Sequence, residues 1–427
     1  MSPAFEIKGW CPSAHRPMES GDGLLIRAKS KQQALTSAQL RAVAEIAADC
    51  GNGLVDLTQR AQLQLRGLSM ATLDDARRRL QESGLYFPGE DFLVDIIANG
   101  FTDAGATAAF DLATLGQTLS RVKERDKTLR ALPPKFLISI DMGGNVSLAD
   151  AQADMRIEAI DAAHAAVCVA GAPNVGVIVA GDDIVPTAHK LMRAFVALRA
   201  QRPGELRRMR HVVAALGLEA LLREAGLEAR PYQWRAPAAL HSTLGVTQAN
   251  GFVSVGVGAA CGRWRADQLA ALADLAEAYG AGGLAPTHWR AFLMSLHDVD
   301  APQKILDAAR ALDLIVSADD PRLAVVACPG APECSQARGE TRTALARLAP
   351  LAQKTAGKDG VGLHVSGCAK GCARPGVTPM TLVANDGRFD LVENGGANDA
   401  PVLCGLDIDA VESALRARVK EAICPTP

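Results

Sequence analysis

Four cysteines in the last quarter of the chain have the spacing of a metal-cluster site. Cys328 and Cys334 form a C-x5-C pair, and Cys368 and Cys372 form a C-x3-C pair after 33 intervening residues. Each pair follows a short apolar run that predicts a β-strand, and glycine or proline stands beside the cysteines. Two strands that end in such loops can bring four thiolates to one point, which is the ligand set of a cubane iron–sulfur cluster.

The alternatives to a cluster at these cysteines are structural zinc, disulfides and plain core thiols. Zinc also takes four thiolates, but zinc sites favour tight C-x2-C pairs, so the x5 and x3 spacings make zinc the weaker alternative. Disulfides belong to exported proteins, whereas the absence of a secretory leader predicts a reducing compartment, the cytoplasm. A core position suits Cys50, Cys168 and Cys261, which stand among small apolar residues. The sequence therefore favours a [4Fe–4S] cluster at the four clustered cysteines.

The composition limits the partners of the protein. The chain has 427 residues, of which 48% are hydrophobic and 22% charged, so it is long enough for several globular domains. The net charge of −2 gives no overall field that would recruit nucleic acid or an anionic membrane. The longest apolar region, 162–180, is interrupted by Pro173 and Asn174, so we expect no membrane span.

An internal repeat divides the chain. Residues 24–68 and 252–297 each predict strand, loop, helix and strand, and another helix follows each copy. Each copy is therefore a β-α-β-α half of a ferredoxin-like sandwich, and the two halves are expected to pair about a pseudo-twofold axis. We predict an α+β fold with half 1 at 1–84, a larger α/β segment at 85–235, half 2 at 236–313, and a cluster-binding α/β segment at 314–427.

The cysteine pairs occur in the second large segment alone. The corresponding places in the first, 94–103 and 135–145, contain no cysteine, so one cluster per chain is expected. A glycine-rich loop at 256–262 lies between a predicted strand and helix, but the equivalent loop of the first copy, 27–33, contains no glycine. A lone glycine-rich loop is weak evidence, and we expect no nicotinamide site here.

Several short motifs, in order along nearly the whole chain, carry a family resemblance. They are Lys8-Gly9-Trp10-Cys11-Pro12, the stretch LTQRAQLQLRG at 57–67, Leu132-Pro133-Pro134-Lys135-Phe136, and the two cysteine loops. Together they resemble the nitrite and sulfite reductase family, whose members surround sirohaem and a small oxyanion with arginines and lysines. Arg60 and Lys135 match two of those basic positions. Leu137 stands at a third, and residues 93–96 read LVDI where the family has an Arg-Asn motif.

The motifs are closer to a branch of this family that acts on a tetrapyrrole than to the reductases. That branch implies an oxidoreductase that uses dioxygen and NADH to hydroxylate precorrin-3A and close a γ-lactone in aerobic cobalamin biosynthesis. It implies a [4Fe–4S] cluster that relays electrons and a non-haem iron that activates dioxygen. An electron-transfer partner is then expected to deliver electrons from NADH. The missing cations make sirohaem unlikely and leave nitrite or sulfite reduction as the alternative function.

A substrate with many carboxylates needs cationic side chains that converge on one cleft. Arg60 and Arg66 lie on or beside one predicted strand, and Gln64 shares their face. We align Arg290 with Arg60 in the repeat, so that both approach the cleft. The full predicted substrate-binding set is Arg60, Gln64, Arg66, Lys135, Arg290, Lys370 and Arg374. The sequence identifies neither the catalytic residues nor the ligands of the non-haem iron.

Overall fold

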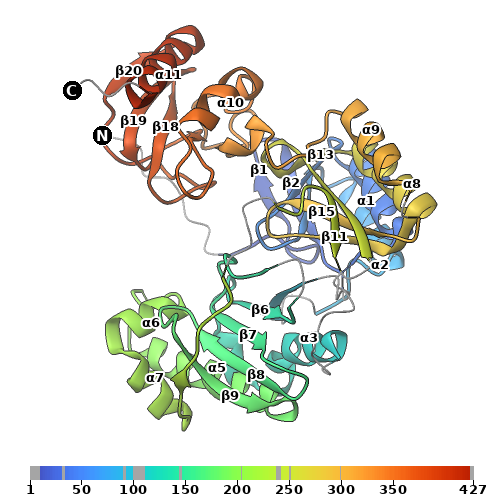
Figure 1. The fold of residues 1–427 in the computed structure, drawn as a ribbon, viewed down its shortest axis with the longest axis vertical. Coiled ribbons are helices and arrows are strands. Elements are labelled where there is room, and N and C mark those ends of the chain that lie inside the picture. Colours follow the sequence, from blue (N-terminus) through green and yellow to red (C-terminus); the bar gives the residue numbers. More distant parts are fainter. Residues whose placement is uncertain are drawn as a thin grey trace.

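The computed structural model describes residues 10–30, 34–89, 93–99, 111–143, 147–202, 204–236, 242–249, 252–298 and 300–423. Its elements form four sheets gathered into three regions (Figure 1). The two repeat copies lie together, drawn in blue and yellow, and each large segment forms a region of its own, drawn in green and in orange to red. Within the described residues, no helix is both long enough and apolar enough to cross a bilayer.

Each repeat copy contributes one antiparallel sheet with helices on one face. The first sheet has the order β1 (Met18–Ser20), β2 (Gly23–Ala28), β4 (Leu63–Leu68), β3 (Leu54–Leu57) and β13 (Arg263–Arg265), with helices α1 (Ser37–Cys50) and α2 (Leu73–Glu82). The second has the order β11 (Gly245–Ala249), β12 (Phe252–Gly258), β15 (Ala291–Leu296) and β14 (Gly280–Pro286), with helices α8 (Ala266–Tyr279) and α9 (Pro302–Ala311).

The two halves exchange segments and share one hydrophobic core. Strand β13 follows β12 in the second half but pairs with β3 of the first, and Leu35 of the first half forms a bridge with Leu284 of the second. Helices α1 and α8 pack together, and Trp264, which is fully buried, lies edge-on against Phe292 at 5.0 Å between ring centres. The repeat therefore builds a single pseudo-symmetric domain rather than two separate ones.

The matched glutamines of the repeat have the same structural task. At the start of α1, Gln39 Oε1 accepts a hydrogen bond from the backbone N–H of Thr36, and at the start of α8, Gln268 Oε1 accepts one from the backbone N–H of Arg265. Both satisfy a backbone donor that a helix start would leave unpaired. Sequence identity at this position thus reflects helix capping.

The two large segments have the same sheet topology. In each, the first two pairs of neighbouring strands are parallel and the next two pairs are antiparallel. The first consists of β5 (Asp95–Ala98), β6 (Leu137–Asp141), β7 (Met155–Ala159), β8 (His164–Val169), β9 (Val175–Ala180), the short β10 (Arg230–Pro231), and helices α3 (Leu112–Ser120), α4 (Val122–Arg125), α5 (Ile184–Ala200), α6 (Met209–Leu216) and α7 (Leu218–Ala225). The second consists of β16 (Val325–Ala327), β17 (Leu363–Ser366), β18 (Thr378–Asn385), β19 (Arg388–Gly395), β20 (Leu403–Leu406), α10 (Leu345–Lys354) and α11 (Ile408–Ile423).

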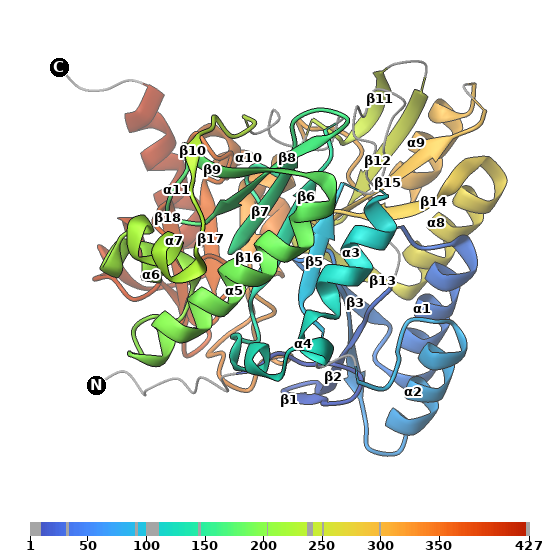
Figure 2. The same cartoon turned by 90° about the horizontal axis from the view of Figure 1, so that it is seen from below.

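This common topology fixes where the cysteine loops lie. The C-x5-C loop follows β16 and the C-x3-C loop follows β17, and these strands are parallel neighbours, so both loops leave the same edge of the sheet. In the first segment the equivalent strands are β5 and β6, drawn side by side in Figure 2. The loops that follow them begin within the stretches that the sequence predicted, although parts of both stretches lie outside the described residues.

Candidate functional site

Hydrogen bonds join the two cysteine loops to each other directly after the strands β16 and β17. The backbone N–H of Cys328 donates to the carbonyl of Val365 at 3.2 Å, which continues the strand pairing by one residue. The backbone N–H of Gly367 then donates to Cys328 Sγ at 3.1 Å. A glycine at 367 is required because a Cβ there would lie 2.7 Å from the side chain of Ala337, in the first loop. The strands thus hold the first thiol of each pair close together.

The four thiols lie within electrostatic range of one another. Burial raises the pKa of Cys328, the backbone N–H groups of Gly367 and Gly330 oppose this, and the thiols of Cys334 and Cys368 raise it further. Burial also raises the pKa of Cys372, the charge of Lys370 lowers it, and the other three thiols raise it. Thiols that resist joint ionisation in this way become favourable ligands once a bound metal compensates the negative charge.

Four cysteines are a ligand set of structural zinc and also of a [4Fe–4S] cluster. A zinc ion with Zn–S bonds of ~2.3 Å needs its four thiolates about 3.8 Å apart. Among the described residues, no group of three or more His, Cys, Asp or Glu side chains has an arrangement that could hold one metal ion. The four cysteines come from two loops and interact electrostatically, and four thiolates are the ligand set of a [4Fe–4S] cluster, which stays a prediction.

The same finding bears on the predicted non-haem iron. Of the histidines described near the centre of the molecule, His288 bonds to Asp150 and His364 is fully buried, and neither belongs to a group of three donors. The described residues therefore do not identify the ligands of the non-haem iron, which stays a prediction.

Glu333, inside the C-x5-C loop, anchors the cluster region to the first sheet. Its side chain accepts from Arg263 at 2.7 Å, and its carbonyl accepts from Arg66 at 2.9 Å and from the backbone N–H of Gly21 at 3.2 Å. Arg66 is 1% exposed, and its three nitrogens donate to Asp22, Asp56, Ser20 and Glu333. Arg66 was predicted to bind substrate, but the structure makes it a positioning residue, because its donors are already used within the protein.

A row of polar side chains crosses the face of the first sheet opposite its helices. Strand pairing aligns Arg27 on β2 with Gln64 on β4, Gln64 with Asp56 on β3, and Asp56 with Arg263 on β13. Residues with the alternate orientation, such as Ile26, Leu65 and Trp264, are buried in the shared core. Because Arg263 also contacts Glu333, one end of this row lies against the cluster loop.

Asp56 is the charge centre of this row. Its burial would raise the pKa of its carboxyl, but the hydrogen bond from Arg263 and the charges of Arg342, Arg263 and Arg66 lower the pKa to about 2. Arg342 also donates to the carbonyl of Cys328 at 3.2 Å. Asp56 therefore joins the first sheet, the second half and the cysteine loop through three guanidinium groups.

Two arginines near the row make no ion pair with a carboxylate of the described residues. Arg27 donates to Gln62 Oε1 at 3.0 Å and to Gln64 Oε1 at 3.3 Å, and burial lowers its pKa. Arg290 donates to the carbonyl of Cys261 at 3.2 Å, and burial lowers its pKa as well. Partly buried guanidinium groups whose hydrogen bonds go to neutral partners can bind an external carboxylate through charge-assisted hydrogen bonds.

The repeat alignment of Arg290 with Arg60 is wrong by one residue. In the β3–β4 turn the backbone N–H of Ala61 donates to the carbonyl of Thr58, and in the β14–β15 turn Arg290 donates in the same way to Thr287. Ala61 and Arg290 also share the left-handed backbone conformation, with φ of 54° and 64°. Arg290 is thus the counterpart of Ala61, and the counterpart of Arg60 is Trp289.

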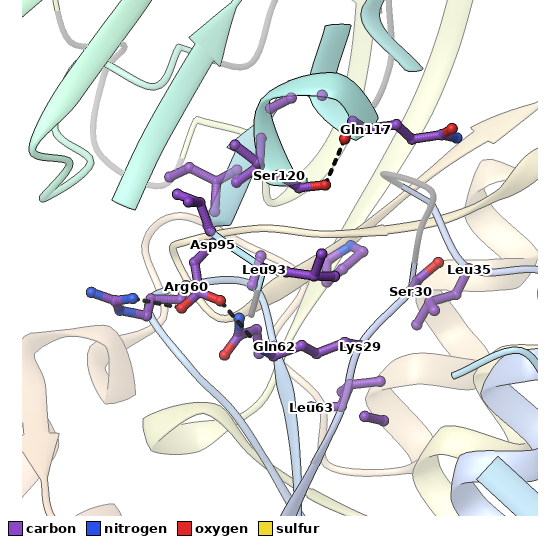
Figure 3. A pocket seen from close by; sticks show the side chains of 18 of the residues that line it. Lys29, Ser30, Leu35, Arg60, Gln62, Leu63, Leu93, Asp95, Gln117 and Ser120 are labelled. Carbon is purple, nitrogen blue, oxygen red and sulfur yellow. Dashed lines mark hydrogen bonds and ion pairs between the residues drawn. The ribbon is translucent and has the colours of Figure 1, made fainter. Parts of the chain in front are cut away.

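Arg60 lies beside a cavity of about 350 Å³ between the halves and the first large segment (Figure 3). Its guanidinium bonds to Asp95 Oδ2 at 2.7 Å and to the carbonyl of Lys135. Lys29 bonds to the other oxygen of Asp95 at 3.3 Å. On another wall, His288 Nε2 lies 2.6 Å from Asp150, which also accepts from Trp289 Nε1 at 2.7 Å.

The remaining predicted residues fall into two places. Lys135 is exposed just before β6, where its carbonyl meets Arg60. Lys370 lies in the C-x3-C loop close enough to affect the Cys372 thiol, whereas Arg374 bonds to Thr378 and Asp359 within its own segment. Gln64, Arg66 and the cysteine loops therefore meet at the polar row, Arg60 and Lys135 meet at the cavity, and Arg374 belongs to neither.

Sequence reasoning missed several residues of this site, namely Arg27, Asp56, Arg263, Arg342, Glu333 and Asp95. Arg27 stands in the N-terminal strand, two residues from Leu25 with the alternation of a half-buried strand, which was a usable signal. The others depend on pairings between segments more than 200 residues apart, or, for Asp95, on the departure from a family motif.

Comparisons with known proteins agree with this architecture. The model of the nitrite/sulfite reductase ferredoxin-like half domain matches residues 16–83 and 246–311, so the predicted duplicated α+β fold is confirmed. The solved NirA protein of Mycobacterium tuberculosis has the same fold, with a TM-score of 0.67 and 18% identity over 93% of this chain and 81% of its own.

Two curated relatives cover most of the chain. The assimilatory ferredoxin-dependent nitrite reductase of Haloferax mediterranei is 26% identical over 88% of this chain and 74% of its own. The precorrin-3B synthase of a Sinorhizobium species is 30% identical over 412 residues, which are 92% of this chain and 84% of its own. The chain therefore belongs to the precorrin-3B synthase family of oxidoreductases, which shares its duplicated half domain with the nitrite and sulfite reductases.

Proposed function

We propose that this protein converts precorrin-3A to precorrin-3B. In the proposed reaction, dioxygen supplies oxygen for hydroxylation of the macrocycle, an acetate side chain closes a γ-lactone, and reducing equivalents come from NADH through an electron-transfer partner. Cys328, Cys334, Cys368 and Cys372 would hold one [4Fe–4S] cluster. When bound, this cluster supplies single electrons, which dioxygen needs because it reacts slowly with closed-shell carbon.

The observation that carries the proposal is that two arginines of the site form no ion pair with a carboxylate of the described residues. Arg27 and Arg290 lie at the polar face of the halves, and the cluster loop lies at the same face through Glu333. A tetrapyrrole with many carboxylates placed there would meet two guanidinium groups whose hydrogen bonds within the described residues go to neutral partners. It would also lie next to the four thiols, as electron transfer requires.

The chain's own residues would then have separate tasks. Arg27 would bind a substrate carboxylate, and Gln62 and Gln64 would fix its planar guanidinium in direction. Arg290 would bind a second carboxylate from the other half, held by the Cys261 carbonyl. Lys135 and Lys370, at the borders of the site, would add further positive charge.

Anaerobic binding of precorrin-3A tests the assignment without requiring turnover. We expect Arg27→Met to weaken binding roughly tenfold or more, because a charge-assisted hydrogen bond to a carboxylate contributes about 1.5–3 kcal/mol. The cluster absorbance should not change. Arg388→Met is the matched control, because Arg388 is exposed and bonds only to the carbonyl of Gly405 among the described residues.

Two outcomes would contradict the proposal. One is normal precorrin-3A binding by the double variant Arg27→Met/Arg290→Met, which would place the substrate elsewhere. The other is efficient reduction of nitrite or sulfite with a viologen donor by the wild-type protein, together with a bound sirohaem, which would favour the reductase alternative.

A further inference from the structure

Every charged side chain that lines the cavity next to Arg60 has an opposite charge beside it. Arg121 bonds to Glu124 at 2.7 Å, His288 to Asp150 at 2.6 Å, and Arg60 and Lys29 both bond to Asp95. The rest of the lining is largely apolar, with Leu35, Leu63, Leu85, Phe87, Leu93 and Leu293 among its members. The charges of this cavity are thus satisfied from within the protein.

Asp95 has the central place in this arrangement (Figure 3). Each of its carboxylate oxygens meets one cation, Oδ2 the guanidinium of Arg60 at 2.7 Å and Oδ1 the ammonium of Lys29 at 3.3 Å. The three side chains are between 10% and 18% exposed, so the pairs are mostly shielded from water. Arg60 comes from the turn after β3, Lys29 from the end of β2, and Asp95 from the first residue of β5.

The cations around Asp95 favour its ionised form. Burial alone would raise the pKa of its carboxyl, but the charges of Lys29, Arg60 and Arg27 outweigh that effect and hold the pKa well below its usual range. The carboxylate of Asp95 therefore occupies the point where an external anion would meet Arg60 and Lys29.

We propose that Asp95 is a specificity-determining residue, a built-in counter-anion that closes the Arg60 corner of the cavity to small oxyanions and to ligand carboxylates. A carboxylate is an anion with two acceptor oxygens, and nitrite, sulfite or sulfate would likewise present negatively charged oxygens to this pair of cations. An external anion would have to displace Asp95 and leave it buried and unpaired, which is strongly unfavourable.

This built-in anion gives a physical reason why the chain differs from its nitrite reductase relatives. A nitrite reductase must bind a small anion, whereas here the protein supplies that anion itself. The consequence for catalysis rests on the proposed function, because it leaves the substrate carboxylates to Arg27 and Arg290. The exclusion of anions from Arg60 and Lys29 by Asp95 does not depend on that function. It can be tested on protein without a bound tetrapyrrole.

Removal of the built-in anion should create an anion site. In Asp95→Asn, Arg60 and Lys29 lose the carboxylate that both of them contact, and the melting temperature should fall in chloride buffer. Sulfate at constant ionic strength should then raise it, with a logarithmic increase at high sulfate, because a ligand at free concentration L that binds only the folded state stabilises it by RT ln(1 + L/Kd). We expect Asp95→Asn to bind sulfate and nitrite at least tenfold more tightly than the wild type.

Two variants control for general salt effects and locate the new site. Glu124→Gln removes a different carboxylate from the lining, one whose partner Arg121 is 63% exposed, and should respond to sulfate like the wild type. Adding Arg60→Met to Asp95→Asn should abolish the gain. If Asp95→Asn does not fold, the double variant Lys29→Met/Asp95→Asn removes one of the two cations together with the carboxylate. Arg60 then remains without the carboxylate of Asp95, and the double variant should still gain sulfate binding.

Two results would overturn the inference. One is an Asp95→Asn protein whose sulfate response equals that of the wild type, and the other is a wild-type protein that already binds sulfate in a saturable way that Arg60→Met abolishes. Neither result would affect the precorrin-3A binding measurements on Arg27 and Arg290, so a failure here and a failure of the proposed function are distinguishable.

Discussion

Asn99 occupies in the first large segment the place that Cys328 occupies in the second. The backbone N–H of Met142 donates to Asn99 Oδ1 at 2.9 Å, just as that of Gly367 donates to Cys328 Sγ at 3.1 Å. Asn99 is 1% exposed, and its Nδ2 donates to Asp141 Oδ1 at 3.0 Å and to the carbonyl of Gly143 at 2.7 Å. Hydrogen bonds of an amide therefore join the two loops that a cluster would join in the other copy.

Replacement of Asn99 should weaken the fold without touching the cluster. Asn99→Ala removes three buried hydrogen bonds, and because each contributes about 1 kcal/mol we expect the free energy of unfolding to fall by about 2–3 kcal/mol. Urea denaturation followed by circular dichroism measures this change. Iron content should stay at the wild-type level, and a loss of iron in Asn99→Ala would mean that the two copies do not have the independent roles described here.

Arg66 should prove to be an anchor of the cysteine loop. Arg66→Met leaves the carboxylate of Asp22 without its buried cation and removes one of the three guanidinium groups around Asp56, so we expect a loss of about 3–5 kcal/mol in the free energy of unfolding. The cluster should also bleach faster in air, because Glu333 loses a contact.

The matched variant Arg66→Lys keeps the charge but cannot reproduce the planar set of donors, so it should recover part of the stability. Unchanged stability together with lost precorrin-3A binding in Arg66→Met would instead restore the direct substrate role predicted from the sequence.

His364 should make the protein sensitive to mild acid. It is fully buried on β17, neither ring nitrogen has a hydrogen-bond partner among the described residues, and burial and the charge of Arg374 lower its pKa to about 4. Between pH of about 6.5 and about 4 the unfolded chain binds a proton that the folded chain refuses, so stability falls as pH decreases through this window. The full effect is about 3 kcal/mol.

The pH dependence can be isolated by comparison with His364→Leu. The free energy of unfolding of the wild type should fall more than that of the variant between about pH 7 and pH 4.5, and denaturant titrations at the two pH values measure both. Acid loss of the cluster affects both proteins alike, so it cancels in the comparison. Equal pH dependence in the two proteins would show that His364 is not held neutral in the fold.

The sequence predicted the elements that repeat, because their signals are local. Apolar periodicity and the capping glutamines Gln39 and Gln268 suffice to define the helices of both halves, and the cysteine spacing defines the cluster loops. The repeat alignment at Arg290 was wrong by one residue because the turn is fixed by a residue with left-handed backbone conformation. Alanine and arginine rarely adopt this conformation, so neither Ala61 nor Arg290 could be recognised as that residue from the sequence.

The charged residues were harder to predict because their roles depend on distant partners. Nothing in the local sequence distinguishes Arg66 from an exposed arginine on a strand. Its buried position depends on a contact with the carbonyl of Glu333, 267 residues further along the chain. The role of Arg60 likewise depends on its ion pair with Asp95. In the sequence, Asp95 was visible only as part of the LVDI stretch that replaces the Arg-Asn motif of the family. Side-chain type indicates charge, but only tertiary structure shows whether that charge is already neutralised.

Iron and acid-labile sulfide, measured per chain in protein purified without oxygen, test the central claim most directly. If the four thiolates from the two loops hold one cubane, the wild type should contain about four of each, Cys334→Ala and Cys368→Ala should lose both, and Cys404→Ala, which removes an exposed cysteine of β20, should keep them. Zinc in place of iron, or no labile sulfide after reconstitution, would contradict the account.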